Sequence, residues 1–168
     1  RKNIGNVNSK INITFLGTLR KRELPTVIFR ALSLCLKKDL SFNFKIIGNQ
    51  QNKESCKWIK KLKSYGNLNE HTLLLGFISE KEKHETLSNS DIFIMLRPDS
   101  SETKHLFPSR VPELMSSGNP VILTKTPSFD FFFKENHGVK FISDKNSAED
   151  LSKAIMELAS DAKVRFEI

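Results

Sequence analysis

The sequence is poor in cysteine and has no long apolar run. Its 168 residues include only two cysteines, Cys35 and Cys56, and both lie in segments with helical periodicity. We expect them to be small buried side chains and not a disulfide framework. No apolar run approaches the ~20 residues of a membrane-spanning helix, and no secretory signal opens the chain. These absences favour a protein of the reducing cytoplasm.

Two nucleotide-binding motifs and one kind of metal site are also absent. The chain contains no Walker sequence and no Gly-x-Gly-x-x-Gly, which disfavours P-loop proteins and dinucleotide-binding enzymes. His71, His84 and His137 show no ligand spacing with cysteines or carboxylates. We therefore expect no metal site.

The composition is that of an ordinary globular domain. Hydrophobic residues make up 38% of the chain and charged residues 27%, with no disordered tract. The length suits one domain, and neither a repeat nor a linker divides it. We expect a single domain over residues 1–168. Because the chain begins at Arg1 without an initiator Met, we interpret it as a fragment of a longer protein.

The formal charge of +8 favours anionic partners such as nucleotide phosphates, nucleic acid or an acidic membrane face. Much of this charge lies in residues 53–63, where Cys56, Ile59 and Leu62 recur at helical spacing and leave the lysines on the opposite face. A solvated helix face is the first interpretation and attraction to a membrane surface the second. Nucleic acid ranks last, and we expect no specific nucleic-acid site.

Strand-like and helix-like segments alternate along the chain. This alternation predicts an α/β, Rossmann-like domain of three layers with a six-stranded parallel sheet. The expected strands are 11–16, 42–47, 72–75, 91–96, 121–123 and 139–142. The expected helices start at 25, 53, 79, 109, 128 and 147, with capping side chains at Ser79, Ser109 and Ser147.

Three glycines follow strands directly, and they indicate where a ligand binds. Gly17, Gly48 and Gly76 each end a predicted strand. In open parallel sheets, ligands bind beyond the carboxyl ends of the strands. We expect the three glycine loops to converge on one edge of the sheet, together with the start of the helix at Ser109.

The segment 107–122 combines a helix start with charged residues of both signs. Ser109 is the expected N-cap, and Arg110 adds a positive charge beside the free N–H groups of the first turn. Glu113 projects one turn deeper, where a carboxylate suits sugar hydroxyls, and Gly118 ends the helix. The pattern indicates a nucleotide-type ligand.

The loop after the first strand is short and basic. Gly17 allows a diphosphate to approach the backbone, and one guanidinium group can bind two phosphate oxygens at once. For each of Arg20, Lys21 and Arg22, a solvated turn is an equal alternative. We expect at least one of the three to bind phosphate.

Together, these segments resemble the C-terminal, donor-binding domain of a GT-B glycosyltransferase of the group 1 family, also called GT4. The resemblance runs from Ile11 to about Asp161 and covers one half of the GT-B fold. It rests on the order and spacing of five landmarks, which are residues 15–19, 44–48, 74–78, 90–94 and 107–122.

The resemblance implies roles for individual residues. Glu113 matches the second glutamate of the family's E-x7-E motif, which binds ribose, and Arg22 resembles the basic residue that holds the diphosphate. His105 stands where the family has the first glutamate, which faces the transferred sugar, so it is expected either to contact that sugar or to lie on a surface loop. The expected catalytic residues are Arg22 and His105, and the expected substrate-binding residues are Gly17, Thr18, Arg20, Lys21, Gly48, Phe77, Ile78, Ser109, Arg110, Val111 and Glu113.

The resemblance also implies an activity, which is transfer of a sugar from a nucleotide-diphospho-sugar to a hydroxyl acceptor in polysaccharide or glycan biosynthesis. Retention of anomeric configuration, no metal or cofactor, an N-terminal acceptor-binding domain and a place near the inner face of a membrane are further implications. The isolated domain is expected to be inactive. The alternatives are a non-catalytic nucleotide-binding module, a basic module for membranes or nucleic acid, and a nucleotide-sugar epimerase domain.

Overall fold

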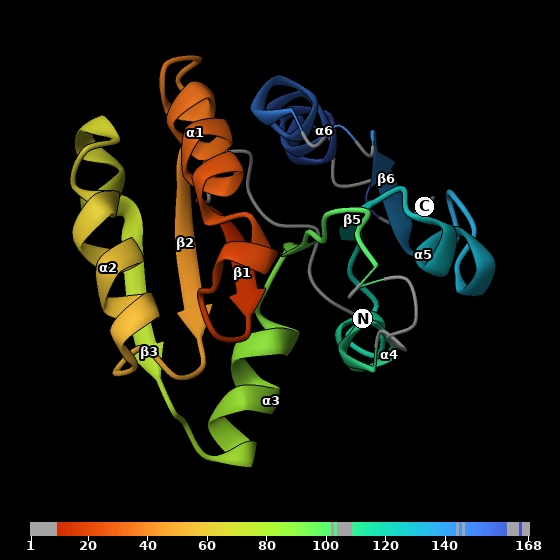
Figure 1. Ribbon diagram of the computed structural model, residues 1–168, viewed down its shortest axis with the longest axis horizontal. Helices are drawn as coiled ribbons and strands as arrows, with labels where there is room; N and C mark the ends of the chain where they lie inside the picture. Colours follow the sequence, from red (N-terminus) through yellow and green to blue (C-terminus); the bar gives the residue numbers. More distant parts are fainter. Residues whose placement is uncertain are drawn as a thin grey trace.

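Six parallel strands form one sheet, and each coincides with an apolar run predicted to be a strand (Figure 1). The computed structural model describes residues 10–101, 103, 109–143, 145, 147–160 and 165. The order β3-β2-β1-β4-β5-β6 confirms the predicted Rossmann-like sheet. The strands are β1 (Ile11–Leu16), β2 (Phe42–Ile47), β3 (Thr72–Gly76), β4 (Ile92–Met95), β5 (Val121–Thr124) and β6 (Val139–Ile142).

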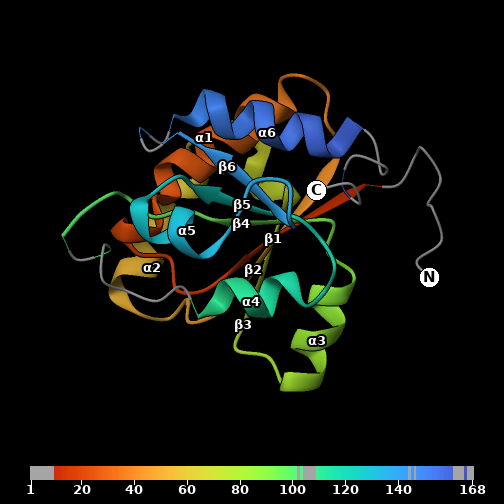
Figure 2. The ribbon, with the colours of Figure 1, turned by 90° about the vertical axis from the view of Figure 1, so that its right-hand side faces the viewer.

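Helices cover both faces of the sheet and make the three layers. Figure 2 shows α1 and α6 above the sheet and α3 and α4 below it. One face carries α1 (Pro25–Leu36), α2 (Lys53–Leu62), α6 (Ala148–Ser160) and the 3-10 helix η2 (Gly66–His71). The other face carries α3 (Glu80–Ser88), α4 (Arg110–Met115) and α5 (Pro127–Phe132).

The strand order creates a switch point between β1 and β4. The chain runs outward from β1 through β2 to β3, and it then returns to place β4 on the other side of β1. The loops that leave β1 and β4 therefore diverge toward opposite faces of the sheet. A crevice at such a point is where open α/β sheets bind ligands.

The core has one apolar cluster on each face of the sheet. Phe15, Phe42 and Phe44 pack with α1 and α6 on one face, and Phe93 packs with α4 and α5 on the other. All residues of β4 and β5 are buried, as expected for central strands covered on both faces.

The helix starts agree with the sequence at two of three predicted caps. Ser79 and Glu82 form a complete capping box, and Ser147 Oγ accepts from the backbone N–H of Asp150 at 2.9 Å. The cap predicted at Ser109 is wrong. Ser109 has helical backbone angles (φ −53°, ψ −24°) and no capping hydrogen bond, whereas a capping residue needs an extended backbone.

The two cysteines are free, but only one is deeply buried. Cys35 has no exposed surface, and burial raises the pKa of its thiol. Cys56 is half-buried, so the prediction that both are buried holds for Cys35 alone.

Within the described ranges, no helix has the length and apolar character that crossing a membrane requires.

Candidate functional site

Gly17 and Gly48, which follow β1 and β2, lie beside Gly76, the last residue of β3, at the carboxyl edge of the sheet. The N–H of Gly17 donates to the carbonyl of Ile47 at 2.8 Å, and the N–H of Gly48 donates to the carbonyl of Gly76 at 2.8 Å. Gly48 has φ +134°, and a Cβ there would collide with the carbonyl oxygen of Gly17. The predicted convergence of these loops is therefore present, and it depends on the missing side chain at Gly48.

The start of α4 also lies at this edge, against the end of β1. Arg110 Nη1 lies 2.6 Å from the position that a Cβ on Gly17 would occupy. The guanidinium therefore fills the space that a side chain at Gly17 would take. Ser109 is exposed beside it, whereas the side chain of Val111 is buried in the core and anchors α4 to the sheet.

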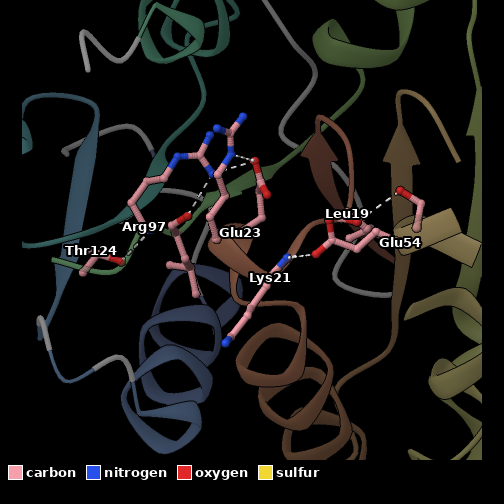
Figure 3. A network of polar contacts seen from close by, with 9 residues as sticks. Leu19, Lys21, Glu23, Glu54, Arg97 and Thr124 are labelled. Atoms are coloured by element: carbon pink, nitrogen blue, oxygen red, sulfur yellow. Dashed lines mark hydrogen bonds and ion pairs between the residues drawn. The ribbon is translucent and has the colours of Figure 1, made fainter. Parts of the chain in front are cut away.

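Glu23 ends the 3-10 helix η1 (Lys21–Glu23) and is buried, with 1% of its surface exposed (Figure 3). Its Oε1 lies 3.3 Å from Arg22 Nε and 3.1 Å from Arg97 Nη1. Its Oε2 is buried and has no hydrogen-bond partner among the described residues. We call Arg22, Glu23 and Arg97, together with Arg110, whose charge acts on Arg97, the arginine cluster.

Arg97 lies two residues beyond the end of β4 and spans the switch point to reach Glu23. Its side chain is 14% exposed, and its backbone N–H donates to Thr124 Oγ1 at 3.2 Å. Burial lowers the pKa of the Arg97 guanidinium, and the positive charges of Arg110 and Arg22 lower it further. The negative charge of Glu23 acts in the opposite direction and raises this pKa. Among the described residues, three guanidiniums and one carboxylate leave two uncompensated positive charges, which favour a doubly charged anion at this edge.

Sequence reasoning missed both Glu23 and Arg97. Glu23 lies in the loop predicted to be short and basic, and it is the most buried charged residue of that loop. The available signal was the position of Arg97, a charged residue directly after the apolar run 92–96.

Glu113 lies in the first turn of α4 and is held from the neighbouring helix α3. Its Oε1 lies 2.8 Å from Lys83 Nζ, which also contacts Glu80 Oε2 at 2.8 Å. The hydrogen bonds with Glu113 and Glu80 raise the pKa of Lys83. The Glu113 side chain is 38% exposed, and within the described part of the chain its second oxygen has no partner, so it can accept a hydrogen bond from a ligand hydroxyl.

The other predicted site residues have different environments. Phe77 follows β3 with 79% of its surface exposed, whereas Ile78 packs partly against the core. Thr18 is half-buried in the loop after β1. Arg20 and Lys21 are exposed in the same loop. His105 lies outside the described residues.

The aromatic run at α5 divides between core and surface. Phe129 is buried, whereas Phe131 and Phe132 are 77% and 49% exposed. Phe129 therefore anchors α5 to the core, and the other two rings face outward. Among the residues with described positions, no three His, Cys, Asp or Glu side chains gather in a way that could hold a metal ion.

Comparison with known proteins identifies one family over nearly the whole chain. The model of the family described as "Glycosyl transferases group 1" matches residues 1–167. No curated protein gives a match to the chain.

Solved structures with a similar fold include LpcC, HepE and WaaG. The C-terminal domain of LpcC, a group 1 glycosyl transferase from Francisella tularensis, has a TM-score of 0.73 and 23% identity, covering 94% of this chain and 80% of that one. HepE from Anabaena, solved with UDP and glucose, has a TM-score of 0.75 and 14% identity, with 94% and 41% covered. WaaG, a glycosyltransferase involved in lipopolysaccharide biosynthesis, has a TM-score of 0.76 and 14% identity, with 95% and 40% covered. The chain thus spans about two fifths of the length of the last two proteins.

Proposed function

Because the chain belongs to the group 1 glycosyl transferases, we propose that it is the donor-binding part of an enzyme that transfers a sugar from a nucleotide-diphospho-sugar to a hydroxyl acceptor. The observation that carries this proposal is the arginine cluster at the switch point. Its two uncompensated positive charges match the charge of a diphosphate. Retention of anomeric configuration and a role in polysaccharide or glycan assembly belong to the same proposal.

The arginine cluster supplies the electrostatic part of the proposed mechanism. When the bond between the anomeric carbon and the diphosphate breaks, negative charge grows on the departing phosphate oxygens. Arg22 and Arg97 are held in place by Glu23, so they stabilise this charge without reorganising at the moment of reaction. Arg110 adds a third guanidinium from the start of α4.

Glu113 gives the donor its orientation along the edge. Its second oxygen accepts from a ribose hydroxyl, and the ion pair with Lys83 holds the carboxylate in place. The exposed ring of Phe77 lies on the loop after β3, and we propose that this loop borders the base. His105 faces the transferred sugar in this proposal.

The acceptor is proposed to bind to a further domain. HepE and WaaG are more than twice as long as the part that this chain matches. A chain that supplies the donor site alone binds the donor and transfers little or no sugar. Products from a longer polypeptide distinguish transfer from epimerisation, because an epimerase releases an altered nucleotide-sugar and needs no acceptor.

Calorimetric titration of the 168-residue chain with UDP and with GDP tests the proposed function. We expect saturable binding of one of them, and Glu113→Gln to weaken it by about tenfold or more, because a hydrogen bond to a charged group contributes about 1.5–3 kcal/mol. Glu149→Gln is the matched control, since Glu149 pairs with Arg30 on the surface of the opposite face. Absence of saturable binding to both nucleotides, or equal affinities of the two variants, contradicts the proposal.

A second candidate property is peripheral attachment to the cytoplasmic face of an anionic membrane. Its basis is the outer face of α2 and the residue after it, where five lysines are exposed and have no carboxylate within ion-pair distance in the described ranges. Binding to vesicles that contain phosphatidylglycerol is expected to weaken steeply with salt. Vesicle binding that persists at high salt, or that survives glutamine at all five positions, refutes this property. The five lysines are Lys53, Lys57, Lys60, Lys61 and Lys63.

A further inference from the structure

A hollow of about 570 Å³ lies next to the arginine cluster, and we call it the loop pocket. It is bordered by the loop after β1, by the start of α2 and by the described part of the loop after β4. The lining residues that matter here are Arg20, Lys21, Arg22, Glu54, Ser100 and Ser101.

Two of the three basic side chains of the loop pocket lack a counter-charge among the described residues. Arg22 is engaged by Glu23, but Arg20 and Lys21 have no carboxylate within ion-pair distance among the residues that the structure describes. Glu54 is the acidic residue in the lining, and its Oε1 accepts from the backbone N–H of Lys21 at 2.7 Å. The pocket wall therefore carries positive charge that no described carboxylate pairs.

Hydrogen bonds hold both walls of the pocket in place. On one side, Ser55 Oγ of α2 donates to the carbonyl of Leu19 at 3.1 Å, next to the Lys21–Glu54 contact (Figure 3). On the other side, Thr103, which is 8% exposed, accepts from the backbone N–H of Ser100 at 3.0 Å. A pocket with fixed walls binds a ligand at a lower cost in conformational entropy.

The position of the pocket relative to the proposed donor site indicates which group reaches it. Glu113 and Lys83 belong to helices on one face of the sheet, whereas Glu54 belongs to α2 on the other. With ribose at Glu113 and the diphosphate at the arginine cluster, the loop pocket lies across the cluster from the ribose. The group beyond the diphosphate is the transferred sugar, and the acceptor saccharide follows it.

We propose that the loop pocket binds a negatively charged substituent of a saccharide, either a phosphate or a carboxylate, through Arg20 and Lys21. The proposal rests on the proposed donor site and adds a substrate class to it. The substituent belongs to the transferred sugar or to the acceptor, and Ser100 and Ser101 offer hydroxyls to the same saccharide.

Paired titrations test the loop pocket. For the acceptor, glucose 6-phosphate is compared with glucose in saturating UDP, and for the donor, UDP-glucuronic acid is compared with UDP-glucose. We expect one charged probe to bind about tenfold or more tightly than its neutral counterpart, as for a charge-assisted hydrogen bond. The pair that shows this preference identifies the source of the charge.

Two double variants that remove the same net charge separate local from general electrostatics. Arg20→Gln/Lys21→Gln is expected to abolish the preference, and Lys60→Gln/Lys63→Gln on α2 to keep it. Because each preference is a ratio within one variant, any loss of nucleotide affinity cancels.

Three outcomes overturn the proposal. They are equal binding of charged and neutral probes in both pairs, an unchanged preference in Arg20→Gln/Lys21→Gln, and competitive displacement of glucose 6-phosphate by UDP, since that phosphate then occupies the arginine cluster. If neither UDP nor GDP binds, the donor-site proposal fails separately. In that case, titration of the two double variants with glucose 6-phosphate in the absence of nucleotide still shows whether Arg20 and Lys21 bind the anion.

Discussion

Replacing Glu23 by glutamine tests whether this buried carboxylate holds the arginine cluster together. Glu23→Gln keeps the shape of the side chain and removes the negative charge between Arg22 and Arg97. The guanidinium of Arg97 then stays 14% exposed without a counter-charge. Arg22 is affected less, because 44% of its side chain reaches solvent.

The structure sets the size of the expected effect. Removing one partner of a buried ion pair costs about 3–5 kcal/mol, because the other charge is left buried. Since Arg22 is largely solvated, we expect a loss near the lower end, about 3 kcal/mol. For a chain of this length, this corresponds to a decrease in Tm of roughly 6–12 °C.

Thermal unfolding followed by circular dichroism measures this effect, and Glu149→Gln is the control. The Arg30–Glu149 pair has a contact of 2.9 Å, but its side chains are 63% and 53% exposed. Exposed pairs contribute less than about 1 kcal/mol. If both variants lower Tm equally, or if Glu23→Gln leaves Tm unchanged, the arginine cluster is not organised by Glu23.

Three further predictions concern single residues. In urea unfolding, Gly48→Ala is expected to destabilise the protein by about 2–3 kcal/mol more than Gly66→Ala. Both glycines have positive φ, but only at Gly48 would the added Cβ collide with backbone. Equal losses of unfolding free energy in the two variants refute the close contact. In the native protein at pH 8, Cys56 is expected to react with iodoacetamide faster than Cys35, because burial raises the pKa of the Cys35 thiol. Mass spectrometry of the labelled peptides measures both rates, and faster labelling of Cys35 contradicts the prediction. Hydrogen bonds from Ser79 at the α3 cap lower the pKa of Glu82. The cap therefore stabilises the fold fully above the unfolded pKa of this carboxyl, and the stabilisation is lost as pH falls through the folded pKa. In an NMR pH titration, the amides of the first turn of α3 should show no change at pH 5–7.

The fold was predictable because its signals are local. The strands at 11–16, 42–47 and 139–142 have the predicted bounds, since each is an apolar run that ends at a turn signal. The capping box at Ser79 is set by side chains three residues apart. The predicted cap at Ser109 failed because the residue type permits a cap only where the backbone is extended, and here the backbone is helical.

The site was only partly predictable because its central contacts join distant residues. Gly17 and Gly48 were placed correctly from the rule that glycines after parallel strands meet at one edge. The Glu23–Arg97 contact joins residues from the loops after β1 and β4, and no local pattern indicates that a carboxylate in a polar loop is buried. The binding roles of Arg22, Glu113 and His105 stay predictions until a ligand is observed.

Mapping the nucleotide on the protein tests the central claim most directly. In ¹⁵N-labelled chain titrated with UDP and with GDP, the account predicts amide shifts that saturate with one nucleotide and cluster at Gly17, Arg97 and Arg110. The opposite edge of the sheet carries a second hollow of about 390 Å³ beside His71 and Asp39. Saturable shifts confined to that hollow, with none at the arginine cluster, contradict the account.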